Sequence, residues 1–350
     1  MLDNDDVVVL DVREPDEFAE WRIPGAMNVP LDALGARLDE IPRHAEIVAV
    51  CAVGARAARA VDVLAAAGIE AEWLEGGMSA WANAYDDAEV AVGGATVVQV
   101  RRRGKGCLSY LIAAGGSAAV IDPSSDIDQY LERAASRGWA LAYVFDTHLH
   151  ADHVSGARAL ADASGAQLVL NPADAFDFDY TPLADGMRIP LADSVSITVS
   201  VLSAPGHTQG STAFLLGDDA IFTGDTLFLE SVGRPDLADR ADEFAHELFH
   251  TLHDKVLGLP DDTLVLPAHF GDAVEVHADT VVTARLGELR ERLWQLDAGE
   301  DEFVAWASRA ATPRPPNYVA IVDANRYGTR MDVAARRDLE VGPNRCAVAS

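Results

Sequence analysis

Short apolar runs recur along the whole chain, and most of them end at a polar or glycine-containing turn. Runs of this length predict buried strands, whereas a surface helix shows apolar residues spaced three and four apart. Near the N-terminus the pattern predicts strands at 7–10 and 47–50 and an alanine-rich helix at 55–67. A helix with proline in its first turn is expected at 14–21. This segment therefore combines short strands with helices.

Strands predominate after residue 95, where glycine-containing turns or helices separate them. The expected strands are 97–100, 108–113, 118–121, 141–145, 195–202, 213–216, 220–223 and 264–266. The expected helices are 126–136, 156–163, 242–256 and amphipathic helices within 280–309. No apolar run reaches the length of a transmembrane helix, so we expect no membrane association.

The chain of 350 residues is long enough for two domains, each with its own core. We expect an N-terminal domain at 1–88 and a linker at 89–94, because the latter segment is short and ends in two glycines. The second domain is expected at 95–280. Residues 281–350 are expected to add helices and a tail that pack on the second domain.

The chain is strongly acidic, with a formal net charge of −29. This charge argues against nucleic acid as a partner, because phosphate binding needs a basic surface. Cysteines are too few for a disulfide framework, and the first residues lack the basic and apolar regions of a signal peptide. We therefore expect a cytoplasmic protein. Because the acidic residues are spread along the chain, we favour a salt-rich cytoplasm over an ordinary acidic enzyme.

Metal-ligand side chains gather in one short segment directly after the run 141–145. Residues 147–153 read Thr-His-Leu-His-Ala-Asp-His, so imidazoles and a carboxylate follow one strand. Both are ligands for Zn²⁺ and Fe²⁺, and a loop at a strand end can direct several of them to one point. Later strand ends carry further residues of this type. The candidate ligands are His148, His150, Asp152, His153, His207, Asp225 and His269.

A cysteine occupies the turn between the strand 47–50 and the helix that follows it. Residues 51–56 read Cys-Ala-Val-Gly-Ala-Arg. Backbone N–H groups and the dipole at a helix N-terminus stabilise an anion, so Cys51 is a candidate nucleophilic thiol. Arg56 is close enough along the chain to support the same charge.

Four motifs in the first segment resemble the rhodanese, or sulfurtransferase, domain. They are Asp11-Val12-Arg13, Ile23-Pro24-Gly25-Ala26, the Cys-x-x-Gly-x-Arg loop of 51–56, and Gly76-Gly77-Met78-x-Ala80-Trp81. The resemblance implies an α/β fold with a parallel sheet, in a domain that is short at its N-terminus. It implies that Cys51 carries a persulfide and that Arg56 supports the anion. Asp11 and Arg13 would be structural or would orient substrate.

The ligand-type residues after residue 95 stand in an order that resembles the metallo-β-lactamase superfamily. That resemblance implies an αββα sandwich with the metal site at one edge of its two sheets. In a two-metal member the ligands would be His148, His150 and His207 for one ion and Asp152, His153 and His269 for the other, bridged by Asp225.

Further motifs resemble the persulfide dioxygenases and their rhodanese fusions. They lie at 106–110, 222–227, 232–237, 267–269 and 342–348. This resemblance implies a single Fe²⁺ held by His148, His207 and Asp225, with open positions for O₂ and substrate. The other candidate ligands would then surround these three residues. Arg234 would contact substrate, and an ion pair with Asp236 is the alternative.

Two metal assignments stay open, one Fe²⁺ or two Zn²⁺, because the ligands of the first are a subset of those of the second. A rhodanese domain handles persulfides, which favours an enzyme that oxidises a low-molecular-weight persulfide with O₂ to sulfite and a thiol. One alternative is a dizinc thioester hydrolase of the glyoxalase II type. Another is a non-catalytic sulfur carrier. The expected partners are the small persulfide or thiol, O₂ and a second copy of the chain in a homodimer.

Several other features are interpreted as structural. Residues 246–250 match His-Glu-x-x-His, but we expect a partly exposed helix there rather than a protease site. The basic run 101–105 is interpreted as a solvated strand end, with attraction of an anionic thiol as the alternative. Cys107 is expected to be a small buried residue, and Cys346 is given no role.

Overall fold

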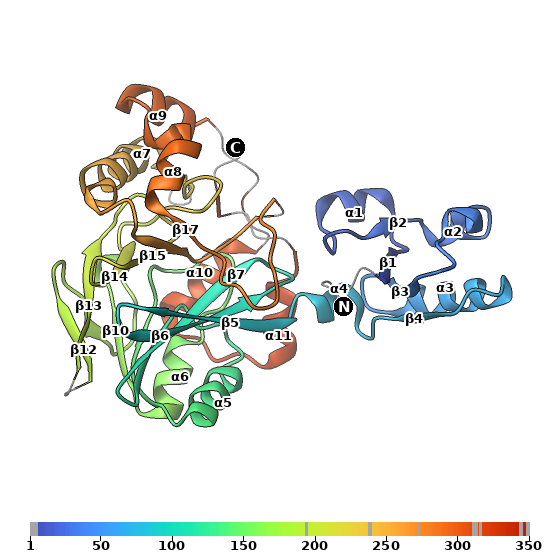
Figure 1. Ribbon diagram of the computed structural model, residues 1–350, viewed down its shortest axis with the longest axis horizontal. Helices are drawn as coiled ribbons and strands as arrows, with labels where there is room; N and C mark the ends of the chain where they lie inside the picture. The colour runs from blue at the N-terminus through green and yellow to red at the C-terminus, as the bar shows by residue number, and fades with distance from the viewer. Residues whose placement is uncertain are drawn as a thin grey trace. The chain divides into compact units, whose positions relative to one another are not determined.

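The structure, a computed structural model, describes residues 6–192, 195–236, 240–271, 273–309, 314, 317–342 and 346–347. These residues form two compact units (Figure 1). Each unit has its own hydrophobic core. The N-terminal unit extends to Asp86 and includes Arg102–Lys105. The C-terminal unit begins at Asp87 and contains nearly all of the remaining chain.

A parallel sheet forms the centre of the N-terminal unit, in the order β2-β1-β3-β4. Its strands are β1 (Val7–Asp11), β2 (Met27–Asn28), β3 (Glu46–Val50) and β4 (Ala71–Trp73). Its helices are α1 (Pro15–Glu20), α2 (Leu31–Leu34), α3 (Ala55–Ala66) and α4 (Gly77–Trp81), with a 3₁₀ turn at Leu38–Glu40. Leu10, Ile47 and Leu64 share one buried core. The expected α/β architecture with a parallel sheet is confirmed.

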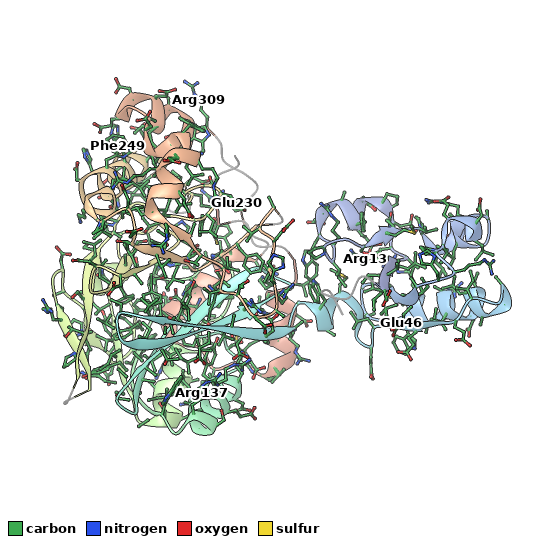
Figure 2. The ribbon with its side chains drawn as sticks, viewed as in Figure 1. Arg13, Glu46, Arg137, Glu230, Phe249 and Arg309 are labelled. Atoms are coloured by element: carbon green, nitrogen blue, oxygen red, sulfur yellow. The ribbon has the colours of Figure 1, made fainter. Side chains whose placement is uncertain are left out.

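A buried ion pair holds the segment that follows β1. Arg13, labelled in Figure 2, donates from Nη2 to Oδ2 of Asp11 at 2.6 Å and from Nε to Oδ1 at 3.0 Å. The same guanidinium donates to the carbonyl of Trp21 at 2.6 Å. Both charged groups are buried, so the two-pronged pairing compensates their lost hydration. This geometry supports a structural role for the pair.

Two sheets form the body of the C-terminal unit. The seven-stranded sheet has the order β11-β10-β9-β8-β7-β6-β5, and the six-stranded sheet has the order β12-β13-β14-β15-β16-β17. The strands of the first are β5 (Tyr85–Val92), β6 (Ala95–Arg102), β7 (Cys107–Ala114), β8 (Ser117–Ile121), β9 (Ala140–Phe145), β10 (Gln167–Leu170) and β11 (Thr181–Pro182). The strands of the second are β12 (Arg188–Ala192), β13 (Val195–Ser203), β14 (Thr212–Leu216), β15 (Ala220–Gly224), β16 (Leu264–Pro267) and β17 (Ala284–Arg285).

Aromatic side chains join the two sheets across the core. The ring of Tyr110 on β7 lies 4.9 Å from that of Phe222 on β15, measured between centroids. The rings of Phe145 on β9 and Phe214 on β14 are also 4.9 Å apart. Such contacts, with the aliphatic residues around them, bury the inner faces of both sheets.

Helices cover the outer faces of the sandwich (Figure 1). They are α5 (Asp128–Arg137), α6 (Ala157–Ser164), α7 (Ala241–His250), α8 (Leu286–Arg292), α9 (Glu300–Ala307), α10 (Tyr318–Tyr327) and α11 (Val333–Leu339). Shorter helical turns lie at Pro172–Asp174, Thr251–Lys255, Val256–Gly258 and Trp294–Leu296. Helices α5 and α6 contact β9 of the seven-stranded sheet, whereas α8 contacts β17 of the six-stranded sheet. The expected αββα sandwich is confirmed.

The expected linker at 89–94 lies instead in β5 and in the turn that joins it to β6. Gly93 and Gly94 have φ angles of 57° and 81°, and this left-handed backbone lets the chain reverse at once. The two glycines therefore end a strand rather than join two domains. The segment after residue 280 supplies β17 to the six-stranded sheet as well as the expected helices.

The basic run 101–105 is not the solvated strand end that we expected. Arg101 is fully buried, and its guanidinium donates to the carbonyls of His277, Ala278 and Thr280. Arg102 is also buried and donates to the carbonyl of Ala82. Backbone carbonyls thus replace water around these two charges. No helix among the described residues is long and apolar enough to cross a membrane.

Candidate metal centre

Four strand ends of the C-terminal unit bring the candidate ligands to one place. The histidine loop (residues 147–155) follows β9, and the loop between β13 and β14 carries His207. Asp225 directly follows β15, and His269 lies two residues after β16. The candidate ligand residues are all 3% exposed or less. The strand-end positions in the sequence are therefore neighbours in space.

His148, His207 and Asp225 form the centre of this cluster. Nε2 of His148 lies 3.7 Å and Nε2 of His207 lies 3.4 Å from Oδ2 of Asp225. One ligand atom from each residue lies within 4.8 Å of the other two. Among the described residues, none of these three atoms has a hydrogen-bond partner. A buried polar atom without a partner costs about 1–3 kcal/mol, so the arrangement fits a cation held between the three side chains.

The other ring nitrogens of the two histidines fix their tautomers. Nδ1 of His207 donates to the carbonyl of Arg234 at 2.8 Å, and a carbonyl can only accept. Nδ1 of His148 lies 2.9 Å from the hydroxyl of Thr147, which itself donates to Asp122 at 2.9 Å. The hydroxyl therefore accepts from His148. In both rings the lone pair remains on Nε2, the atom that faces Asp225.

Burial keeps these imidazoles neutral in the metal-free protein. Burial, with the neighbouring His150, lowers the pKa of His148 well below its ordinary value. Burial also lowers the pKa of His207. The pKa of Asp225 is lowered instead, because His269 and His148 outweigh the effect of burial. Two neutral imidazoles and one carboxylate are a donor set suited to Fe²⁺ or Zn²⁺.

His150 lies beside this triad and faces other carboxylates. Its Nε2 is 3.1 Å from Oδ1 of Asp122 and 3.8 Å from Oδ1 of Asp146. Burial would lower the pKa of His150, but these carboxylates raise it to about 9. Its Nδ1 has no hydrogen-bond partner among the described residues. His150 therefore belongs to a second group of possible ligands with the two aspartates.

His269 connects the triad to a further group of buried ligand-type residues. Its Nδ1 lies 2.6 Å from Oδ1 of Asp225, and its Nε2 lies 3.0 Å from Oδ2 of Asp152. His153 also contacts Asp152 through Nδ1, at 3.1 Å. Burial opposes a charge on His269, but the two carboxylates raise its pKa well above the ordinary value. Both ring nitrogens of His269 thus face carboxylate oxygens, as an imidazolium that joins Asp152 to Asp225 would.

Two cysteines complete this region, although the sequence analysis assigned neither of them to the metal centre. Sγ of Cys107 lies 3.5 Å from Oδ2 of Asp152, and Cys107 could share a metal ion with Asp152, His153 and His269. Cys346 is 1% exposed and lies within 4.8 Å of Asp225 and His269. Burial, with Asp225 and Asp152, raises the pKa of the Cys346 thiol. Cys107 is buried as we expected, but its surroundings are those of a ligand.

Two aspartates that hold the loops in place were also missed. Asp174 accepts from the backbone N–H of Leu149 at 2.7 Å and of Gly210 at 2.8 Å, so it ties the histidine loop to the His207 loop. Asp122 accepts from the backbone N–H of Thr147 at 2.6 Å. Both aspartates come shortly after an apolar strand, and that signal could have identified them.

The thiol of Cys51 lies where β3 meets α3 in the N-terminal unit. Its Sγ accepts from the backbone N–H of Gly54 at 3.1 Å and of Ala57 at 3.4 Å. Gly54 has a φ of 102°, a left-handed backbone that only glycine adopts easily. These donors form a cradle that favours negative charge on a sulfur atom.

Two family models match this chain. One, described as the metallo-beta-lactamase superfamily, matches residues 102–269, and the other, described as a rhodanese-like domain, matches residues 1–84. The protein named persulfide dioxygenase ETHE1, mitochondrial, of Bos taurus is 31% identical over 211 residues, which cover 59% of this chain and 78% of that protein. The chain belongs to the metallo-beta-lactamase superfamily. Its N-terminal unit is a rhodanese-like domain.

Other similar proteins lie in the same superfamily. The hydroxyacylglutathione hydrolase of Methylococcus capsulatus is 34% identical over 195 residues, which cover 54% of this chain and 72% of that protein. The crystal structure of ETHE1 from Myxococcus xanthus is 28% identical, with a TM-score of 0.60, and the match covers 67% of this chain and 99% of that one. The chain is thus similar both to persulfide dioxygenases and to a hydroxyacylglutathione hydrolase. These two likenesses do not distinguish an oxidation from a hydrolysis.

In this metallo-beta-lactamase domain, Arg234 is 1% exposed and lies beside the triad. Its Nε and Nη2 donate to the two carboxylate oxygens of Asp236 at 2.7 and 2.8 Å. Its backbone carbonyl holds His207, as described above. The ion pair with Asp236 and the contact with His207 both position the metal centre. A direct contact between Arg234 and substrate stays a prediction.

In the rhodanese-like domain, Arg56 pairs with a carboxylate. Its Nη1 and Nη2 donate to the two oxygens of Glu17 at 2.7 and 2.8 Å, and these bonds lower the pKa of Glu17 to about 2. Both terminal nitrogens of Arg56 thus bind Glu17, and support of a charge on Cys51 by Arg56 stays a prediction.

The motif at 246–250 lies on α7, which ends at His250. His246 and His250 are 45% and 55% exposed at their side chains, and both contact Glu300 on α9. The motif thus belongs to a partly exposed helix.

Proposed function

We propose that this chain is a persulfide dioxygenase that holds one Fe²⁺ through His148, His207 and Asp225. The observation that carries the proposal is the convergence of three buried ligand atoms without hydrogen-bond partners among the described residues. Likeness to the persulfide dioxygenase ETHE1 supports the substrate class. Ferrous iron bound by these two imidazoles and the carboxylate would supply redox chemistry with O₂ and a sulfur substrate.

The residues of the chain prepare this site in three ways. Thr147 and the carbonyl of Arg234 keep the lone pairs of His148 and His207 on the nitrogens that face the metal. His269 holds one oxygen of Asp225 and leaves the other for the metal. Burial of all these groups limits access of water, which strengthens their electrostatic interaction with a cation.

The overall reaction would be R–S–SH + O₂ + H₂O → R–SH + SO₃²⁻ + 2H⁺. The S–S bond breaks, the outer sulfur atom is oxidised and O₂ is reduced. The protein orients the persulfide and provides the bound metal. We further propose that Cys51 carries the sulfane sulfur as a persulfide, with its negative charge held by the N–H groups of Gly54 and Ala57.

The test is anaerobic purification, metal analysis and measurement of O₂ uptake with a low-molecular-weight persulfide. We expect about one iron per chain, and O₂ uptake that matches sulfite formation. His148→Ala should abolish both, whereas His246→Ala on the exposed face of α7 should change neither. Cys51→Ala should keep O₂ uptake with added persulfide but lose sulfur transfer to a thiol acceptor. If His148→Ala were harmless and only Cys51→Ala inactivated the chain, a sulfur carrier would replace the dioxygenase.

A second candidate function is a dizinc thioester hydrolase of the glyoxalase II type. The observation that favours it is the group of ligand-type residues next to the triad, Cys107, Asp152, His153 and His269. Likeness to a hydroxyacylglutathione hydrolase supports it as well. This enzyme would contain two zinc ions per chain and would cleave a thioester without oxygen. Thioester cleavage under anaerobic conditions therefore separates the two proposals.

A further inference from the structure

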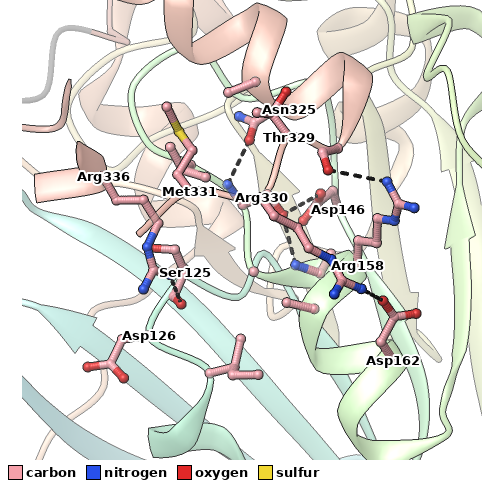
Figure 3. A pocket seen from close by; sticks show the side chains of 18 of the residues that line it. Ser125, Asp126, Asp146, Arg158, Asp162, Asn325, Thr329, Arg330, Met331 and Arg336 are labelled. Atoms are coloured by element: carbon pink, nitrogen blue, oxygen red, sulfur yellow. Dashed lines mark hydrogen bonds and ion pairs between the residues drawn. The ribbon is translucent and has the colours of Figure 1, made fainter. Parts of the chain in front are cut away.

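A cavity of about 590 Å³ is lined in part by Val154 and Ser155, at the end of the histidine loop (Figure 3). We call it the back cavity. It is bounded by the first turn of α6, the end of α10, the turn 329–331 and α11. Small-molecule sites have volumes of roughly 300–1,000 Å³, so the back cavity can hold a metabolite. None of His148, His207 and Asp225 lines it, whereas Asp146, from the group of possible ligands around His150, does.

Three arginines from separate segments line the back cavity. Arg330 pairs with Asp162 at 3.1 Å. Arg158 donates to the carbonyl of Gly328 at 3.2 Å, and its guanidinium lies 4.8 Å from the centre of the Phe178 ring.

Arg336 donates to the carbonyl of Ser125 at 2.5 Å. Within the described part of the chain, Arg158 and Arg336 thus contact carbonyls and a ring rather than carboxylates. Each guanidinium has five N–H donors, so most of them remain for a ligand.

Two of these guanidiniums keep donors for an anion, in a cavity whose lining also contains four aspartates. The chain has 56 acidic and 27 basic residues, so a carboxylate is usually available to pair with a guanidinium. Helix α6 begins beside Arg158 with Gly156 as its N-cap, and a glycine cannot cap with a side chain. The positive end of the helix dipole adds to the field of the arginines. Asp126 and Asp128 are exposed at the rim, and Asp146 is buried at the base, where it accepts from Ser155.

Apolar side chains line the rest of the back cavity. They include Phe176, Phe178, Met331, Val154 and Leu170. The rings of Phe176 and Phe178 are 5.7 Å apart. A ligand that meets both the arginines and these rings would carry an anionic group on an apolar or aromatic body.

The wall of the back cavity is also the support of the histidine loop. Asn325 lines the cavity and donates from Nδ2 to the carbonyls of His150 and His153 at 2.9 and 2.8 Å. Its Oδ1 accepts from the backbone N–H of Ser155 at 2.9 Å. Ser155 in turn donates to Asp146 at 2.7 Å. A ligand that contacts this wall therefore acts directly on the backbone of the loop that presents His148.

We propose that the back cavity binds a small organic anion with an aromatic or apolar body and that its occupancy stabilises the histidine loop. The site is distinct from the metal centre and does not depend on the reaction proposed above. Such a ligand would regulate the enzyme, because the loop it stabilises carries a metal ligand.

Binding can be tested on the full chain with naphthalene-1-sulfonate as the probe, by isothermal titration calorimetry. The matched ligand is naphthalene-1-sulfonamide, which keeps the ring and loses the charge. We expect the uncharged ligand to bind about tenfold more weakly or worse, as for the loss of charge-assisted hydrogen bonds. Arg158→Gln and Arg336→Gln should each weaken the sulfonate by about the same factor. Arg285→Gln, which removes an exposed pair with Asp262, should have no effect.

Thr329→Glu provides a variant that leaves the arginines and their contacts in place. It adds a negative charge at an exposed position of the wall and should also weaken the sulfonate. Equal binding of the two ligands, or unchanged binding in all three cavity variants, would overturn the site.

Stabilisation of the loop is measured separately, by hydrogen exchange of a peptide that contains 147–155. The sulfonate should slow its exchange in the natural chain but not in Thr329→Glu. Exchange that is unchanged at saturating sulfonate would overturn the link to the histidine loop.

Discussion

The two oxygens of the Asp225 carboxylate differ in their surroundings. Nδ1 of His269 lies 2.6 Å from Oδ1. Oδ2 has no hydrogen-bond partner among the described residues and is the atom nearest to Nε2 of His148 and His207. The ring of His269 therefore fixes the rotation of the carboxylate about its own bond. It also supplies a charge that keeps Asp225 ionised.

Replacing His269 should weaken metal binding although its ring is not one of the three proposed ligands. In His269→Gln the carboxylate of Asp225 loses a charged partner and a fixed orientation. Partners of metal ligands are typically worth 10–100-fold in affinity, so we expect a loss of that order. Anaerobic titration with Co²⁺, followed by its visible absorption, measures the change. His250→Gln on the exposed face of α7 is the control, and equal affinity in both variants would contradict this role.

Gly233 should tolerate no side chain, because it lies against the metal centre. A Cβ atom at this position would overlap the carbonyl oxygen of Asp225 and contact Cβ of His207. We expect Gly233→Ala to lower the free energy of unfolding by about 1–3 kcal/mol, as overpacking does, and to weaken Co²⁺ binding. Gly258→Ala is the matched control, since a Cβ there meets nothing within 4 Å. Urea unfolding and Co²⁺ titration of both variants test the prediction, and similar behaviour would refute it.

The sequence was informative about the metal ligands because each one lies in the loop that follows a strand. A sheet brings its strand ends to a common edge, so His207, Asp225 and His269 could be grouped although they are far apart along the chain. The αββα fold itself followed from the resemblance that this order of ligands carries. At these positions, the placement of a ligand-type residue after a strand was enough to predict that the side chains lie close together.

Other features depend on contacts that a local pattern does not contain. Cys346 comes to the metal centre from the far end of the chain, and the motif at 342–348 that contains it indicated a family resemblance but no position for its thiol. Arg101 is buried because carbonyls at 277–280 accept its hydrogen bonds, whereas its charge alone predicted exposure. Two adjacent glycines are as typical of a hairpin turn as of a linker, so Gly93 and Gly94 could not distinguish them.

The buried pair of Asp11 and Arg13 should be essential to the stability of the rhodanese-like domain. Asp11→Asn leaves the guanidinium buried without a countercharge, which typically costs about 3–5 kcal/mol. The double variant Asp11→Leu with Arg13→Met removes both charges and should recover most of the loss. Peptide-resolved hydrogen exchange in urea, read on β1 and β3, reports this domain alone. A double variant no more stable than Asp11→Asn would show that the pair is needed for more than charge compensation.

The pair of Glu17 and Arg56 should give the rhodanese-like domain a stability that depends on acid pH. The hydrogen bonds from Arg56 lower the pKa of Glu17 from 4.5 to about 2. A carboxyl group whose pKa is lower in the folded than in the unfolded state stabilises the fold above the unfolded value. That contribution is then lost as the pH falls from 4.5 through about 2. Both side chains are about one-third exposed, so solvent limits the contribution to about 1 kcal/mol.

Glu17→Gln should therefore destabilise the domain at pH 7 and make little difference near pH 2. The amide of the variant still accepts one hydrogen bond from Arg56 but carries no charge, so the loss of stability comes from the missing charge. Hydrogen exchange of peptides from β3 and α3 in urea, compared with the natural chain at each pH, measures the difference. Glu40→Gln is the control, since it removes an exposed pair with Arg37 in the same domain. A difference that is constant between pH 7 and pH 2, or an equal effect of Glu40→Gln, would mean that the Glu17 charge is not the source of the stability.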